Sequence, residues 1–114
     1  GGVLEPVGAH PVIIEDGAFL GAGSIVVEGI RVRKNAILAP GLILSRSTRV
    51  VDLVNERELE RGEAIPENAV VVQGSRASSS AWGRERGFQI STPLIVKYRD
   101  EKTNASLVLE EALR

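Results

Sequence analysis

The sequence predicts an all-β fold, a parallel β-helix wound from hexapeptide repeats, and two linked periodicities carry this prediction. Aliphatic residues recur at every sixth position, and a small or aliphatic residue follows each of them four places later. The two series are Ile14, Leu20, Val26, Val32, Leu38 and Leu44, and Ala18, Ser24, Ile30, Ala36, Leu42 and Thr48. On an α-helix six residues turn through about 240°, so these series would scatter over three faces. Strands have a period of two, so every sixth side chain can point inward.

Each hexad is expected to form one short face of a three-sided coil, so that three hexads complete a turn. Coils stacked about 4.8 Å apart would then align the aliphatic side chains as interior columns. Glycines fall where the corners are expected, where a residue without Cβ can adopt positive φ: Gly17, Gly21, Gly23, Gly29 and Gly41. The regular coil is expected from about Val12 to Val50. The general preference for right-handed crossovers would favour a right-handed coil.

The charged segment that follows interrupts this repeat. Residues 52–64 are predicted to loop out from the coil, and the repeat resumes with Ile65 and Val71 at the inward position. Residues 1–76 are therefore expected to form the β-helix coils with this external loop.

Residues 77–114 are expected to leave the coil and pack on it. The small, polar stretch 76–81 predicts a linker, and residues 94–99 have the aliphatic density of a short strand that pairs antiparallel or covers an open end. Thr103 or Asn104 would then cap a terminal helix. We expect the strand and the helix to cap the β-helix.

Composition disfavours several classes of function. A net charge of −1 gives no electrostatic reason to expect a nucleic-acid or membrane partner. The chain has no cysteine and one histidine, too few for a zinc centre within one chain, so no metal is expected. A cytoplasmic protein is the default expectation. The apolar opening at Gly1–Leu4 carries no cap, which favours a fragment of a longer protein.

Two residues are candidates for proton transfer. His10 precedes a proline in an irregular stretch without a nearby carboxylate, so we interpret it as a solvated loop residue. Glu28 lies beside a glycine at an expected corner, where a carboxylate partly buried against a neighbouring chain could accept a proton.

A cofactor arm could lie along a groove at corners such as Ala39, Gly41 and Ser45. Its phosphates could be met by basic residues, namely Arg46, Arg76 and Lys97.

Several ordered segments resemble one enzyme family. They are GGVLEP at residues 1–6, IIEDGAFLG at 13–21, VVEG at 26–29, ST at 47–48, VVV at 70–72 and IVK at 95–97. Together they resemble the carboxy-terminal part of the 2,3,4,5-tetrahydropyridine-2,6-dicarboxylate N-succinyltransferases. The chain departs from many relatives at Ile25, where they carry glutamate.

The resemblance implies a left-handed parallel β-helix and a homotrimer with its active site between adjacent subunits. It also implies transfer of a succinyl group from succinyl-CoA to tetrahydrodipicolinate in lysine and diaminopimelate biosynthesis. Glu28 would be the acid/base or substrate-orienting group, and residues 39–47 and Lys97 would lie near CoA. With Arg76, the cofactor-binding candidates are Ala39, Gly41, Ser45, Ser47, Arg76 and Lys97.

Two alternatives stay open. Another CoA-dependent acyltransferase of the hexapeptide type would act on a different amine acceptor. A non-catalytic β-helix would instead serve only as a trimerisation module.

Overall fold

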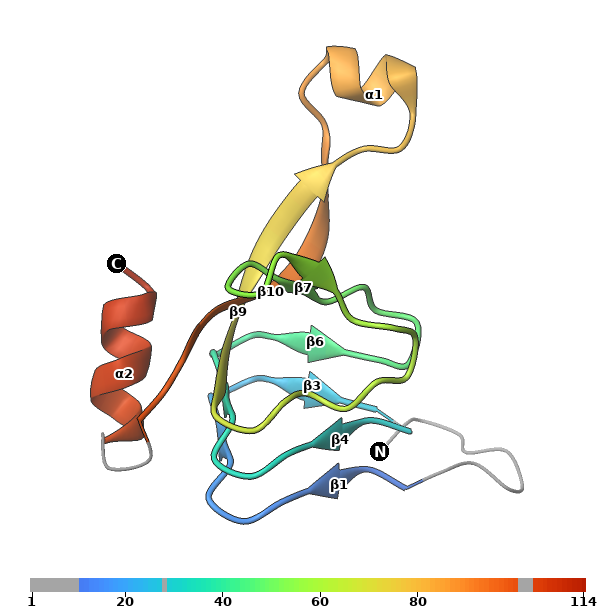
Figure 1. Cartoon of the computed structure of the whole chain (residues 1–114). Coiled ribbons are helices and arrows are strands. Elements are labelled where there is room, and N and C mark those ends of the chain that lie inside the picture. The colour runs from blue at the N-terminus through green and yellow to red at the C-terminus, as the bar shows by residue number, and fades with distance from the viewer. Residues whose placement is uncertain (1–10, 28, 101–103) are drawn as a thin grey trace.

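The computed structural model describes residues 11–27, 29–100 and 104–114, and its first part is a stack of three-sided coils (Figure 1). The first coil consists of β1 (Ile13–Ile14), β2 (Phe19–Leu20) and β3 (Ile25–Val26), and the second of β4 (Arg31–Val32), β5 (Ile37–Leu38) and β6 (Ile43–Leu44). Each strand of the first coil pairs in parallel with the strand eighteen positions on, as Ile13 does with Arg31. The coiled parallel strands and the three hexads per turn are confirmed.

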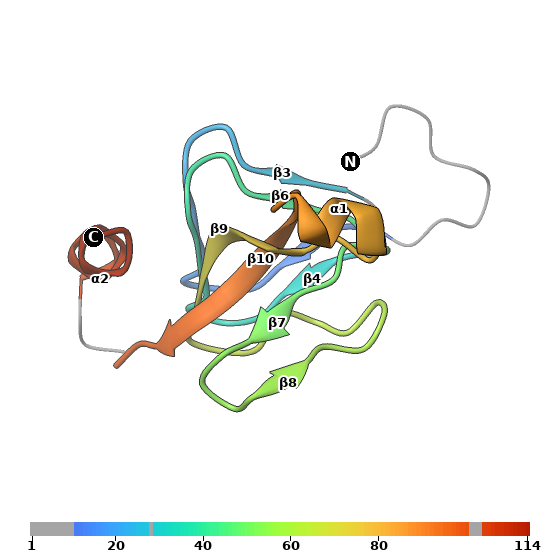
Figure 2. The ribbon, with the colours of Figure 1, turned by 90° about the horizontal axis from the view of Figure 1, so that it is seen from above.

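The charged segment after the second coil contains a hairpin. Strands β7 (Val51–Asp52) and β8 (Arg57–Glu58) pair antiparallel and lie outside the coils (Figure 2). The chain then returns at Ile65, which bridges Val32 in parallel, and β9 (Ala69–Ala77) continues the column of β2 and β5.

The rest of the chain differs from the expected linker and short strand. β9 runs through Arg76 to Ala77, the helix α1 (Ala81–Glu85) follows, and β10 (Gln89–Tyr98) returns antiparallel to β9. The linker prediction was wrong because small polar residues can also line a solvent-exposed two-stranded ribbon. The first three residues of β10, Gln89–Ser91, are also exposed, and the first half of the strand contains one aliphatic residue, so aliphatic density showed only the second half.

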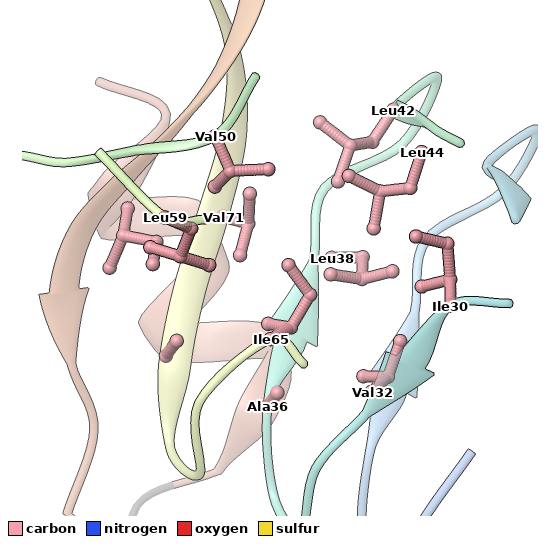
Figure 3. Packing of buried hydrophobic residues seen from close by; sticks show 12 residues of the cluster. Ile30, Val32, Ala36, Leu38, Leu42, Leu44, Val50, Leu59, Ile65 and Val71 are labelled. Carbon is pink, nitrogen blue, oxygen red and sulfur yellow. The ribbon is translucent and has the colours of Figure 1, made fainter. Parts of the chain in front are cut away.

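The interior column is packed as predicted in the second coil (Figure 3). Val32, Leu38 and Leu44 are at most 1% exposed and pack with Ile65 in one hydrophobic cluster. Ile14 and Leu20 of the first coil are 40% and 41% exposed, because among the described residues no further coil stacks beneath them.

Ile95 of β10 belongs to the interior cluster and is fully buried, so β10 crosses over one end of the stack (Figure 2). The helix α2 (Ala105–Ala112) instead lies along one side, where its Val108 and Leu109 pack against Ile37 and Val70. The strand therefore covers the end of the coil and the helix covers a lateral face.

Asn104 caps α2, accepting from the backbone N–H groups of Ser106 and Leu107. Among the described residues no helix is long and apolar enough to cross a membrane.

A buried carboxylate joins the hairpin to β10. Asp52 has no exposed surface, and it accepts hydrogen bonds from the Tyr98 hydroxyl at 2.6 Å, from Asn55 Nδ2 at 2.8 Å and from two backbone N–H groups. Burial raises the pKa of Asp52, but these hydrogen bonds outweigh burial and the net shift is downward. Burial and the bond to Asp52 raise the pKa of Tyr98 to about 12.

The coils also approach closely at one corner. A Cβ on Gly21 would lie 2.7 Å from the backbone carbon of Ala39 in the next coil, so only glycine fits there.

Candidate functional site

The corner that follows the β3–β6 face contains two of the predicted cofactor-binding residues, Ser45 and Ser47. The N–H of Val27 donates to Leu44 O at 3.0 Å, which places the first coil directly against the second at this corner. Glu28, the predicted proton-transfer group, lies outside the described residues. Its neighbour Gly29 has φ of 81°, a conformation that favours glycine and turns the chain into the next face.

In the second coil the same corner carries a cluster of hydroxyls, which we call the serine corner (Ser45, Ser47 and Thr48). Ser45 Oγ lies 2.9 Å from Thr48 Oγ1 and 3.2 Å from Ser47 Oγ, and the Ser45 N–H donates to Thr48 Oγ1 at 2.9 Å. The backbone turn is closed by Thr48 N–H donating to Ser45 O at 3.0 Å. Ser47 is exposed, so its hydroxyl faces solvent and can hydrogen-bond a ligand.

Ala39 and Gly41 occupy the preceding corner of the second coil. The Ala39 N–H donates to Val71 O at 2.9 Å and the Gly41 N–H to Ala22 O at 3.0 Å. Both donors are therefore used within the stack, and Ala39 itself is buried. Gly41 is exposed, and a Cβ built on it would meet nothing within 4 Å, so there is open space above this glycine.

Arg76 and Lys97 lie far apart along the β9–β10 ribbon. Lys97 pairs with Val70 on β9, and its Nζ is 3.7 Å from Glu111 Oε2 on α2. Arg76 lies six residues further along β9, about 20 Å at the rise of an extended strand, on the ribbon that leads to α1. The structure does not bring these two cations together.

A cleft of about 340 Å³ adjoins the serine corner. We call it the hairpin cleft; it is lined by Ser47, Thr48, Arg49, Glu58, Leu59 and Arg61. Sequence reasoning placed Ser47 near a cofactor but missed Arg49 and Arg61. For Arg61 the only signal was the density of charge between residues 52 and 63, which gave no indication of which charges face the coil; Arg49 lies outside that stretch.

Two other pairs of charged groups have shifted pKa values. The hydrogen bond from Arg31 to Glu15 holds the pKa of Glu15 below its ordinary value. The hydrogen bonds between Arg57 and Glu63 lower the pKa of Glu63 and raise that of Arg57. Within the described ranges, no three His, Cys, Asp or Glu residues gather in a way that could hold a metal ion.

Comparisons with known proteins add a family context to this geometry. A family profile described as "Hexapeptide repeat of succinyl-transferase" matches residues 11–46. Over all 114 residues the chain is 45% identical to the 2,3,4,5-tetrahydropyridine-2,6-dicarboxylate N-succinyltransferases of Nitrobacter winogradskyi and Bradyrhizobium diazoefficiens. The resemblance to these N-succinyltransferases is confirmed.

The chain is also 42% identical over the same 114 residues to Protein TabB of Pseudomonas amygdali pv. tabaci. These alignments cover the whole chain but only 40% of the two succinyltransferases and 39% of Protein TabB. The chain thus spans about two fifths of the length of the curated relatives it matches.

Proposed function

We propose that this chain forms the hexapeptide-repeat part of an N-succinyltransferase. The protein would transfer a succinyl group from succinyl-CoA to tetrahydrodipicolinate, in the succinylase branch of lysine and diaminopimelate biosynthesis. One observation carries this proposal: the 45% identity to enzymes of that name runs along the entire chain, through the coils, the insertion and the terminal helix. The cytoplasmic location expected from the sequence stays a prediction.

The proposal includes a left-handed coil and a homotrimer with active sites between adjacent copies. The resemblance to the family supports both features. The β3–β6 face is consistent with a neighbouring copy, because Ile25 and Ile43 stack in register on its outer surface and are 50% and 54% exposed. Such a copy would lie beside the corner that holds Gly29 and the serine corner.

In the proposed reaction Glu28 acts as the general base. Water first adds across the C=N bond of tetrahydrodipicolinate, which gives the ring nitrogen an N–H. As this nitrogen attacks the thioester carbonyl, a C–N bond forms, the C–S bond breaks, and the nitrogen proton passes to Glu28 and then to the leaving thiolate of CoA. Ala39, Gly41, Ser45 and Ser47 would lie along the pantetheine arm. In this proposal Arg76 and Lys97 would contact CoA from other surfaces of the assembly.

The test uses the full-length protein, succinyl-CoA and tetrahydrodipicolinate, with release of the CoA thiol as the measurement. Glu28→Gln removes the base and is expected to lower kcat by about 10²-fold or more. Glu67→Gln is the matched control, because Glu67 is exposed on a corner of another face, and its kcat should equal that of the wild type. Unchanged turnover in Glu28→Gln would eliminate Glu28 as the proton acceptor.

A second candidate is an acyltransferase of the same type with another amine acceptor. The 42% identity to Protein TabB favours testing it, because that relative does not carry the succinyltransferase name. Turnover with succinyl-CoA on an alternative cyclic amine, without turnover on tetrahydrodipicolinate, would select this candidate. A trimer by light scattering that turns over no acyl-CoA would instead indicate a scaffold module.

A further inference from the structure

The hairpin cleft is lined by two arginines and two hydroxyl groups. Arg49 belongs to the end of the coil and Arg61 to the insertion, and Ser47 and Thr48 line the cleft at the serine corner. One carboxylate, Glu58, also lines the cleft. It lies 3.7 Å from Arg49, and both side chains are at least half exposed, so this pair is weak and its geometry is adjustable.

Two further acidic groups of the insertion, Asp52 and Glu63, are engaged elsewhere, Asp52 with Tyr98 and Asn55. Glu63 accepts two hydrogen bonds from Arg57, at 2.6 and 3.1 Å, and a third from the Glu60 N–H at 2.9 Å. This fork is the strong ion pair of the insertion and fixes its shape. Among the residues that the structure describes, Arg61 forms no ion pair. The lining of the hairpin cleft thus holds two arginines against one carboxylate, Glu58.

A third arginine is held close to the cleft by two glycines. A Cβ on Gly29 would lie 3.5 Å from Arg46 Cδ, and a Cβ on Gly62 would lie 3.4 Å from Arg46 Nε. Arg46 therefore passes between Gly29, at the corner of the first coil, and Gly62 of the insertion, which directly follows Arg61 in the chain. The described residues supply no salt bridge to Arg46 either. The two glycines leave room for its side chain.

We propose that the hairpin cleft binds a phosphate group of the acyl-CoA cosubstrate, an inference that rests on the proposed succinyltransferase function. Guanidinium groups give phosphate oxygens charge-assisted hydrogen bonds in a fixed fork geometry, and hydroxyls of the serine corner can supply further donors. A phosphate monoester offers three terminal oxygens and close to two charges, which suits several separate cations better than one carboxylate does. The insertion at residues 52–64 thus contributes one wall of the cosubstrate site.

Binding is measured first with adenosine 3′,5′-bisphosphate and inorganic phosphate, by calorimetry on the full-length protein at low ionic strength. The double variant Arg49→Gln/Arg61→Gln is expected to raise the Kd of the bisphosphate by about tenfold or more. The matched control, Arg33→Gln/Arg114→Gln, removes the same charge at exposed positions outside the cleft and should stay within about twofold of the wild type.

Kinetics then identify which phosphate is bound. In the double variant the KM for succinyl-CoA should rise with kcat unchanged. If the 3′-phosphate occupies the cleft, succinyl-3′-dephospho-CoA has a high KM in the wild type and the double substitution does not raise it further. If the diphosphate occupies the cleft, the substitution raises the KM of both thioesters.

The inference is overturned if the double variant binds the bisphosphate as the wild type does, or if the control loses as much affinity. Because binding of the bisphosphate needs no acyl transfer, this result is separate from the proposed function. A protein that binds it through Arg49 and Arg61 but transfers no succinyl group would refute the reaction and keep the phosphate site. If the protein transfers succinyl but the double variant has an unchanged KM for succinyl-CoA, the reaction is kept and the phosphate site is refuted.

Discussion

Replacing Tyr98 with phenylalanine tests the buried hydrogen-bond network that joins β10 to the β7–β8 hairpin. The change removes one hydroxyl and keeps the ring, so the buried Asp52 carboxylate loses its 2.6 Å partner. A hydrogen bond to a charged group contributes about 1.5–3 kcal/mol. The rise in the pKa of Tyr98 from 10.0 to about 12 corresponds to about 2.7 kcal/mol, an upper value because the side chain is partly exposed. We expect the free energy of unfolding to fall by about 2 kcal/mol.

The pH dependence gives this prediction a sign. Above about pH 10 the unfolded chain loses the phenolic proton while the folded chain keeps it until about pH 12, so the contribution of Tyr98 is complete below this window and is lost as pH rises through it. At about pH 11 some 1.4 kcal/mol of it should be gone in the wild type. Tyr98→Phe has no phenol to titrate, so the difference in stability between the two proteins should shrink.

The assay is urea denaturation followed by circular dichroism near pH 8 and pH 11, together with tyrosinate absorbance. Tyr98 is the single tyrosine of the chain, so the difference in absorbance between wild type and variant reports its titration directly. A phenol that titrates near pH 10 in the folded protein, or a variant as stable as the wild type at pH 8, would refute the reasoning.

Three further outcomes follow from the packing. Leu38→Ala should lower the free energy of unfolding by about 2–5 kcal/mol, and Leu53→Ala, at an exposed position of the β7–β8 hairpin, by less than about 1 kcal/mol; equal denaturation midpoints would contradict the assignment of inside and outside. Gly21→Ala should cost about 3 kcal/mol because its methyl meets the backbone of the next coil, whereas Gly41→Ala, with φ of 75° and open space, should cost about 1 kcal/mol of backbone strain. Asp52→Asn should lower the free energy of unfolding by about 2–3 kcal/mol near pH 7. The difference in stability between wild type and variant should disappear in acid, since stability from a depressed carboxyl pKa is present above about pH 4 and lost as pH falls through the folded pKa. A difference that persists at about pH 2 would contradict this prediction.

Much of the fold was predictable because the hexad is a local code. The inward positions Val32, Leu38 and Leu44 were identified from spacing alone, and they are buried. The candidate site was predicted less completely. Ser45 and Ser47 do lie at one corner, but Arg49 and Arg61 were not found, because their approach depends on a hairpin whose charged sequence carries no periodicity. Glu28 lies outside the described residues, and its proposed role stays a prediction.

The sequence by itself determined the winding of the chain. A six-residue aliphatic period is compatible with short inward-facing strands and incompatible with a helix, and this holds whatever the chain packs against. The tertiary structure alone decided what lies beside the coils: that β10 inserts between β9 and β7, that α2 covers a side, and that the insertion forms a basic cleft with the serine corner. These contacts join residues far apart in sequence, so they depend on complementary surfaces that no local pattern records.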